Sequence, residues 1–69
     1  MNMRKLFGVM REHGDTQETL AAALGIARVT LNKKIHGRNG SSFTQPEIAI
    51  IRARYALDAA AVEAIFFNE

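Results

Sequence analysis

Basic and amide side chains gather in one short segment of this chain, and they are its best candidates for chemistry. Residues 28–38 contain no acidic side chain and four basic ones, which are Arg28, Lys33, Lys34 and Arg38. Residues 1–27 contain equal numbers of acidic and basic side chains, and residues 39–69 contain more acidic ones. A positive field on one element is typical of a nucleic-acid-binding surface, whereas the alternative interpretation is a solvated helix face.

The run Gln17–His36 has the pattern of two short helices joined by a tight turn. Its letters are QETLAAALGIARVTLNKKIH. Ala21 is small where two helices would cross closely, and Gly25 permits the left-handed backbone that ends a helix. Ile26 then follows as a residue that we expect to be buried. One apolar stripe on each helix follows i, i+4 spacing, and its members are Leu20, Leu24, Leu31 and Ile35.

The outward face of the second helix carries side chains that match the edges of DNA bases. If the apolar stripe faces inward, Arg28 and Asn32 point outward one turn apart, with Val29 and Lys33 beside them. Arginine fits guanine O6 and N7, asparagine pairs with adenine N6 and N7, and valine contacts the thymine methyl group. We therefore predict that these four residues contact bases in a major groove. In the alternative interpretation Asn32 is an ordinary solvated residue and Val29 a half-buried one.

The stretch from Thr16 to Arg38 resembles the Cro and repressor type of phage regulators, the XRE family. The letters LGIARVTLNKKIHGR carry the resemblance, and the later segments FTQPEI and AIFF resemble small all-helical members of the family. The resemblance implies a lambda-repressor-like domain whose helix-turn-helix motif inserts the helix Arg28–His36 into a DNA operator. It also implies a transcriptional repressor from a phage or prophage. Members usually have Ser or Thr where Ala27 stands, so we expect a weaker start to that helix.

Contacts to the DNA backbone follow from the same resemblance. It implies that Gln17, at the start of the first helix of the motif, reaches a phosphate or an outer base, and the positive end of that helix favours the same phosphate. Phosphate contacts set the register of a protein on DNA without reading its sequence. The other residues predicted to make them are Thr30, Lys34, Arg38 and Asn39.

Helical periodicity and capping residues predict five helices and no strand, and hence a compact all-α bundle. Gly14, Gly25 and Gly37 are placed to end helices, and residues 44–47 have the form of a capping box with proline in the first turn. The polar run 38–42 is the one clear loop. The predicted helices run near Met3–His13, from Thr16 to Leu24, from about Arg28 to His36, from Thr44 to about Ala56, and onward from Asp58.

The last predicted helix is the candidate for a homodimer interface. Two adjacent aromatic residues, Phe66 and Phe67, cannot both face the same core from one helix. Repressors of this type bind two half-sites about 34–36 Å apart, so each protomer needs a self-complementary patch away from the base-contacting helix. The residues predicted to form that patch are Ala61, Ala64, Ile65 and Phe67. In the alternative interpretation Phe67 covers the base of its own domain.

The composition argues against several other classes of protein. A chain of 69 residues makes one domain, 1–69, and it has no cysteine for a disulfide or a thiol nucleophile. His13 and His36 are too isolated for a metal site, and no catalytic or phosphate-loop motif is present, so we predict no enzyme activity, cofactor or small-molecule ligand. No apolar run approaches the roughly 18 residues of a membrane-spanning helix. We therefore expect a cytoplasmic protein that does not associate with a membrane. The alternative function is a protein-interaction module of the same fold, of antirepressor or antitoxin type.

Overall fold

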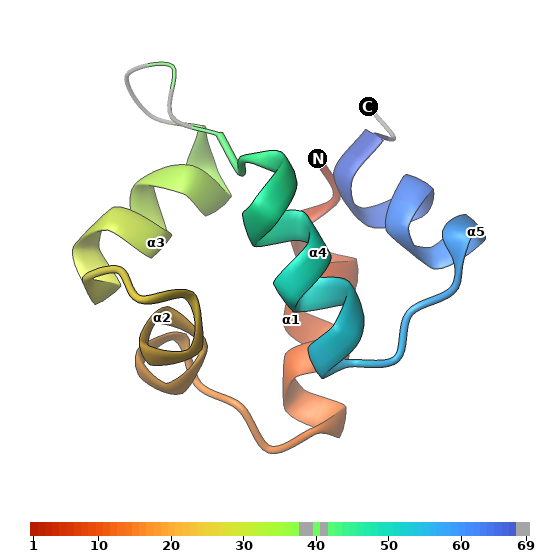
Figure 1. The fold of residues 1–69 in the computed structure, drawn as a ribbon, viewed down its shortest axis with the longest axis horizontal. Helices are drawn as coiled ribbons and strands as arrows, with labels where there is room; N and C mark the ends of the chain where they lie inside the picture. Colours follow the sequence, from red (N-terminus) through yellow and green to blue (C-terminus); the bar gives the residue numbers. More distant parts are fainter. Residues whose placement is uncertain (38–39, 41, 68–69) are drawn as a thin grey trace.

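The structure is a compact set of short helices (Figure 1). It is a computed structural model that describes residues 1–37, 40 and 42–67, and within them there is no strand. Its principal extents are 27 × 25 × 21 Å. The all-α prediction is confirmed. The elements are α1 (Met3–Glu12), α2 (Gln17–Leu24), α3 (Arg28–His36), α4 (Gln45–Arg54), α5 (Ala59–Val62) and a π-helical segment, η2 (Glu63–Phe67).

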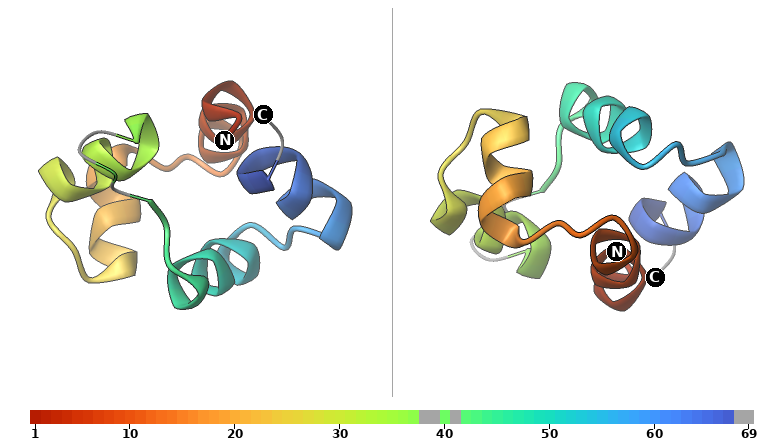
Figure 2. Two further views of the ribbon diagram at one scale, coloured as in Figure 1. Left: turned by 90° about the horizontal axis from the view of Figure 1, so that it is seen from above. Right: turned by 90° about the horizontal axis from the view of Figure 1, so that it is seen from below.

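The helices surround one apolar core. In both views of Figure 2, α1 and α4 lie on opposite sides of the molecule, with α2 and α3 at one end and α5 at the other. The side chains that are most completely buried come one from each of α1, α2, α3, α4 and η2, and they are Leu6, Leu20, Leu31, Ile51 and Ile65. Every long element therefore depends on the others for its apolar contacts.

Side-chain caps start the helices where the sequence predicts them. Thr16 caps α2 by accepting a hydrogen bond from the Thr19 backbone N–H at 3.2 Å. Thr44 and Glu47 form the predicted capping box at the start of α4. By contrast, α3 begins after Ala27 without a side-chain hydrogen bond at its cap, as its alanine predicts.

The turn between α2 and α3 depends on one left-handed residue. Gly25 has φ of 71° and its N–H bonds the carbonyl oxygens of the last turn of α2. A Cβ atom added there would meet nothing within 4 Å, so the backbone angle, and not crowding, favours glycine. Ala21 is buried as predicted, whereas Ile26 is half-buried against the core.

The C-terminal parts of three predicted helices differ from expectation. The helix predicted to reach about Ala56 ends at Arg54, because the Leu57 N–H bonds the Arg52 carbonyl at 3.0 Å and Ala56 takes a left-handed backbone with φ of 52°. The last helix continues from α5 as the wider η2. The first helix ends at Glu12, one residue earlier than predicted.

Helix length limits what these elements can do in a membrane. The longest helices have 10 residues, and no helix in the described part of the chain is long and apolar enough to cross a bilayer.

Candidate nucleic-acid interface

The two sides of α3 are sharply different. Leu31 and Ile35 are buried in the core, whereas Val29, Lys33 and His36 are exposed. Since successive residues of an α-helix are turned by about 100°, these exposed residues lie on the side opposite the buried stripe. Val29 is 66% exposed, so it is not the half-buried residue of the alternative interpretation.

Asn32 lies at the edge of the buried stripe and not opposite it. Its side chain is half-buried, and its Nδ2 donates a hydrogen bond to Oε1 of Gln17 at 3.2 Å. This contact corrects the expectation that Asn32 is fully directed to solvent on the far side of the helix. It also joins α3 to the first residue of α2, which fixes the side chain between the two helices.

The residues predicted to contact bases come together around one hollow. This hollow, called the α3 hollow below, has a volume of about 200 Å³ and is lined by Gln17, Arg28, Val29, Asn32 and Lys33. Two cationic side chains, two amides and one branched apolar side chain therefore share a single concave surface. Such a set can donate to, accept from and make apolar contact with the edges of base pairs.

The ammonium group of Lys34 is engaged in contacts within the protein. Its Nζ forms an ion pair with Oε1 of Glu47 at 2.9 Å and donates to the Ser42 carbonyl at 3.1 Å. The two charged side chains are only 15% and 12% exposed. Lys34 is therefore paired within this structure, where its charge holds α3 to the start of α4, and its contact to a DNA phosphate stays a prediction.

The Glu47 carboxylate belongs to both the cap and the ion pair. Burial raises the pKa of this carboxyl, but hydrogen bonds from the backbone N–H and side chain of Thr44 and from Lys34 outweigh burial and lower its pKa below the usual value. The ionised form is thus the one that the fold stabilises.

The other residues predicted to contact the DNA backbone do not all lie at the α3 hollow. Thr30 is exposed on α3, but it does not line the α3 hollow. Arg38 and Asn39 lie outside the described residues. Of those predicted backbone contacts that the structure describes, Gln17 alone lines the α3 hollow.

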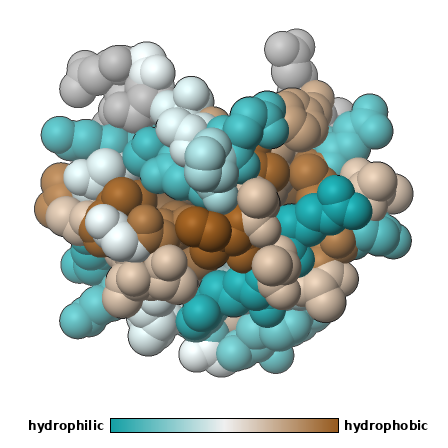
Figure 3. All heavy atoms as spheres, in the orientation of Figure 1, coloured by the Kyte–Doolittle hydropathy of each residue, from teal (hydrophilic) through white to brown (hydrophobic). Residues whose placement is uncertain are grey.

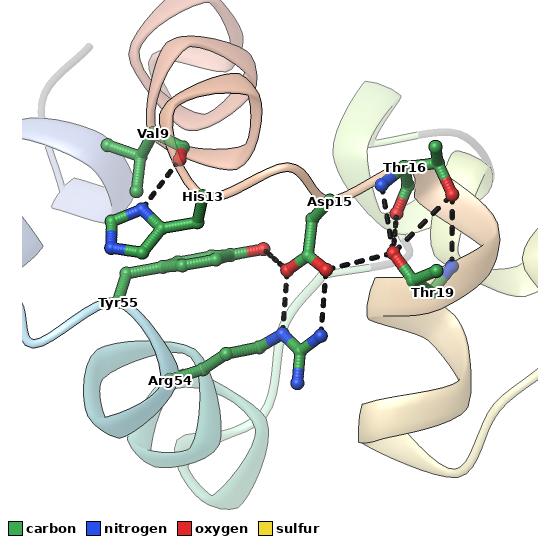
Figure 4. A network of polar contacts seen from close by, with 7 residues as sticks. All are labelled: Val9, His13, Asp15, Thr16, Thr19, Arg54 and Tyr55. Carbon is green, nitrogen blue, oxygen red and sulfur yellow. Dashed lines mark hydrogen bonds and ion pairs between the residues drawn. The ribbon is translucent and has the colours of Figure 1, made fainter.

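A second polar cluster lies at the start of α2, around Asp15 (Figure 4). Asp15 accepts hydrogen bonds from Nε and Nη2 of Arg54 at 2.6 and 2.7 Å, from the Tyr55 hydroxyl at 2.6 Å and from the Thr19 hydroxyl at 2.9 Å. The ring of His13 packs on Tyr55, with ring centroids 5.0 Å apart. This Asp15 cluster ties the connection between α1 and α2 to the end of α4.

Sequence reasoning missed the Asp15 cluster, which joins residues 39 and 40 positions apart. The hydrogen bonds and charge of Arg54 outweigh desolvation and, with Tyr55 and Thr19, hold the pKa of the Asp15 carboxyl well below its usual range. Burial and the neighbouring carboxylate raise the pKa of Tyr55. The cluster is therefore built around an ionised Asp15 and a neutral Tyr55.

The candidate dimer patch is only partly exposed. Ala61 and Ala64 are half-buried, and Phe67 is 59% exposed. Ile65 is 2% exposed and belongs to the protomer core, so its assignment to an interface is wrong. Phe66 packs against the core and meets Phe43 edge to face at 5.5 Å between ring centroids. The two adjacent aromatic residues thus do face different surroundings.

Within the described residues, no three His, Asp or Glu side chains lie close enough together to hold a metal ion. Comparisons of the chain with models of protein families, with curated proteins and with solved structures found no match.

Proposed function

We propose that this protein is a sequence-specific DNA-binding transcriptional regulator in which α2, the turn at Gly25 and α3 act as a helix-turn-helix motif. The observation that carries the proposal is the α3 hollow, because the four residues predicted to contact bases line it together with Gln17. In this proposal α3 lies in the major groove, and Arg28 and Lys33 supply the positive charge.

The hydrogen bond between Gln17 and Asn32 supports a base-reading role. Asn32 uses one of its two amide protons in this bond at 3.2 Å, which leaves the other proton and the side-chain oxygen free. Those two groups are what a bidentate contact to adenine N7 and N6 requires. Because the side chain is already oriented, less rotamer entropy is lost when it binds.

We propose repression by promoter occupancy, in the manner of phage Cro and repressor proteins, with a homodimer on two half-sites. Phe67 is the exposed aromatic residue that would enter the dimer contact, beside Ala61 and Ala64. A hollow of about 280 Å³ next to it, lined by Arg52, Ala59, Val62, Glu63 and Phe67, gives a partner side chain a place to pack.

The experiment that tests this function is selection from a pool of random double-stranded DNA, followed by binding titrations on the enriched sequence and on a scrambled one. The enriched sequence should bind more tightly than the scrambled sequence at one fixed salt concentration. Arg28→Lys, which keeps the charge but loses the planar fork, should reduce that preference. If no sequence is enriched, the proposed function is wrong.

A second candidate function, binding to another protein, is favoured by one specific observation. Three of the exposed large apolar side chains, Met1, Met3 and Phe67, line a groove of about 490 Å³ beside the end of α3. Figure 3 adds a band of hydrophobic groups across the middle of the face on which α4 lies in front. Ile50, a residue of α4, is 41% exposed. Exposed apolar surface of this kind is typical of protein contacts. Failure to enrich any DNA, together with a stable protein complex, would favour this candidate.

A further inference from the structure

An unexplained glycine lies in the interior of α1. Gly8 is exposed, its φ is not in the left-handed region, and a Cβ atom added to it would meet nothing within 4 Å. Neither a turn nor internal packing therefore requires glycine here. Glycine inside a helix is less stable than alanine, so its presence at this position lowers the stability of α1.

Two arginines lie on the same face of α1 as this glycine. Arg4 is four residues before Gly8 and Arg11 is three residues after it, which places all three on one side of an α-helix. Both arginines are exposed. The ion pairs found among the described residues are those of Lys34 with Glu47 and of Arg54 with Asp15, and neither uses these two arginines.

One residue of this α1 face, Arg11, is connected with the α3 hollow through Gln17. A second hollow of about 400 Å³, called the α1 hollow below, lies between α1 and the start of α2, and both Arg11 and Gln17 line it. Gln17 also lines the α3 hollow. A rigid ligand seated against α3 and continuing past Gln17 therefore next meets Arg11.

From these observations we propose that a DNA phosphodiester backbone passing over Gln17 continues onto α1, where Arg11 and Arg4 contact phosphates and Gly8 lets that backbone approach closely. This inference rests on the proposed DNA-binding function and extends its surface to a helix outside the α2 and α3 pair. Phosphate contacts by arginine add affinity without sequence preference, and glycine is the residue that removes side-chain bulk where a ligand approaches a backbone. Both views of Figure 2 show α1 on the side of the molecule opposite α4.

The decisive experiment compares two variants of α1 with the same change of charge. Arg11→Gln should weaken binding to the selected and the scrambled DNA by the same factor, and it should flatten the slope of log K against log salt by about 0.9. Lys5→Gln, about 120° around the same helix from Arg11, should change the slope clearly less. Both residues are exposed, and circular dichroism should show equal helix content in the two variants. Equal slopes for the two variants would overturn the inference.

Gly8→Ala separates a ligand contact from a structural role, because it should change thermal stability and DNA affinity in opposite directions. The variant should raise the midpoint of thermal unfolding, since alanine favours the helix, yet it should bind DNA more weakly. A raised midpoint with unchanged or tighter DNA binding would contradict the close approach at Gly8. If the unaltered protein enriches no DNA sequence, the proposed function itself fails, and that result is distinct from a failure confined to the α1 variants.

Discussion

Two polar clusters lie near the first turn of α2: the Asp15 cluster, and the pair of Gln17 and Asn32 at the α3 hollow. They differ in how many of their hydrogen-bond donors and acceptors find a partner within the protein. The carboxylate of Asp15 is 8% exposed and accepts from Arg54, Tyr55 and Thr19. The amides of Gln17 and Asn32 share one hydrogen bond, beside exposed cationic side chains. A cluster whose groups are satisfied by one another stabilises the fold, and one with donors and acceptors left over is suited to bind a ligand.

The largest effect should come from breaking the satisfied cluster. Asp15→Ala removes the shared acceptor of Arg54, Tyr55 and Thr19, and hydrogen bonds to a charged group contribute about 2–3 kcal/mol to the free energy of unfolding. For a domain of this size that corresponds to a loss of about 10–20 °C in the midpoint of thermal unfolding. Glu18→Ala, which removes an exposed acid of the same turn, is the matched control. A loss no larger than that of the control would mean that the Asp15 cluster does not hold α4 to α2.

A change in the pair of Gln17 and Asn32 should affect DNA binding more than stability. Asn32→Ala should weaken binding to the selected DNA by about 1–3 kcal/mol while leaving the affinity for scrambled DNA nearly unchanged. The midpoint of thermal unfolding should move far less than in Asp15→Ala, because a single hydrogen bond between uncharged groups, that of Asn32 to Gln17, is lost. Equal losses on both DNAs would show that Asn32 contacts only the backbone of DNA.

Of the two clusters, only the Asp15 cluster should make the stability of the fold depend on acid pH. The pKa of Asp15 is lowered in the folded state, so its stabilising effect is present above the unfolded value of about 3.9 and is lost as the pH falls below it. The midpoint of thermal unfolding should therefore begin to fall at about pH 5 and should go on falling below about pH 3, towards the lowered pKa of the folded state. In Asp15→Asn the midpoint should start lower and fall less, with the lowered pKa of Glu47 supplying the remaining dependence. Parallel pH profiles of the two proteins would contradict this assignment.

The smallest expected difference is between variants of two adjacent lysines of α3, in the salt dependence of DNA binding and in stability. Lys33 lies at the α3 hollow, and Lys33→Ala should flatten the salt dependence of DNA binding by about 0.9 without changing stability. Lys34 is paired with Glu47, so Lys34→Ala should leave that slope nearly unchanged and lower the free energy of unfolding by about 0.5–1 kcal/mol. Salt titrations and thermal melts on both variants test the pair together. If Lys34→Ala also flattens the slope, the ion pair opens when DNA binds.

Local features of the fold could be predicted from the sequence because they are encoded within a few residues. The caps at Thr16 and Thr44 and the left-handed residues Gly25 and Gly37 lie next to the turns that they determine. The buried positions of α3 and α4 follow from helical period alone. The wider turns of η2 have no such local signal, and the sequence predicted an ordinary helix there.

Contacts between distant residues could not be predicted, and they changed the candidate site in two places. Lys34 looks like any other lysine in the basic run, because nothing near it in the sequence reveals that Glu47, 13 residues later, will lie within 2.9 Å. Asn32 likewise meets Gln17 across 15 residues. The relative placement of two helices depends on the whole core, and a single sequence pattern does not contain it.

The hydrogen bonding of Asn2 has a consequence for the order of events during synthesis. Its backbone N–H donates to the carbonyl of Ile65 at 2.6 Å, and α1 packs against η2. A growing chain on the ribosome makes α1 first and η2 last of the described elements, so the contacts of α1 with η2 must wait until Ile65 has emerged. The native core can therefore close only late in translation. A nascent chain stalled before η2 should be cleaved by protease in α1, and one stalled well beyond it should be protected.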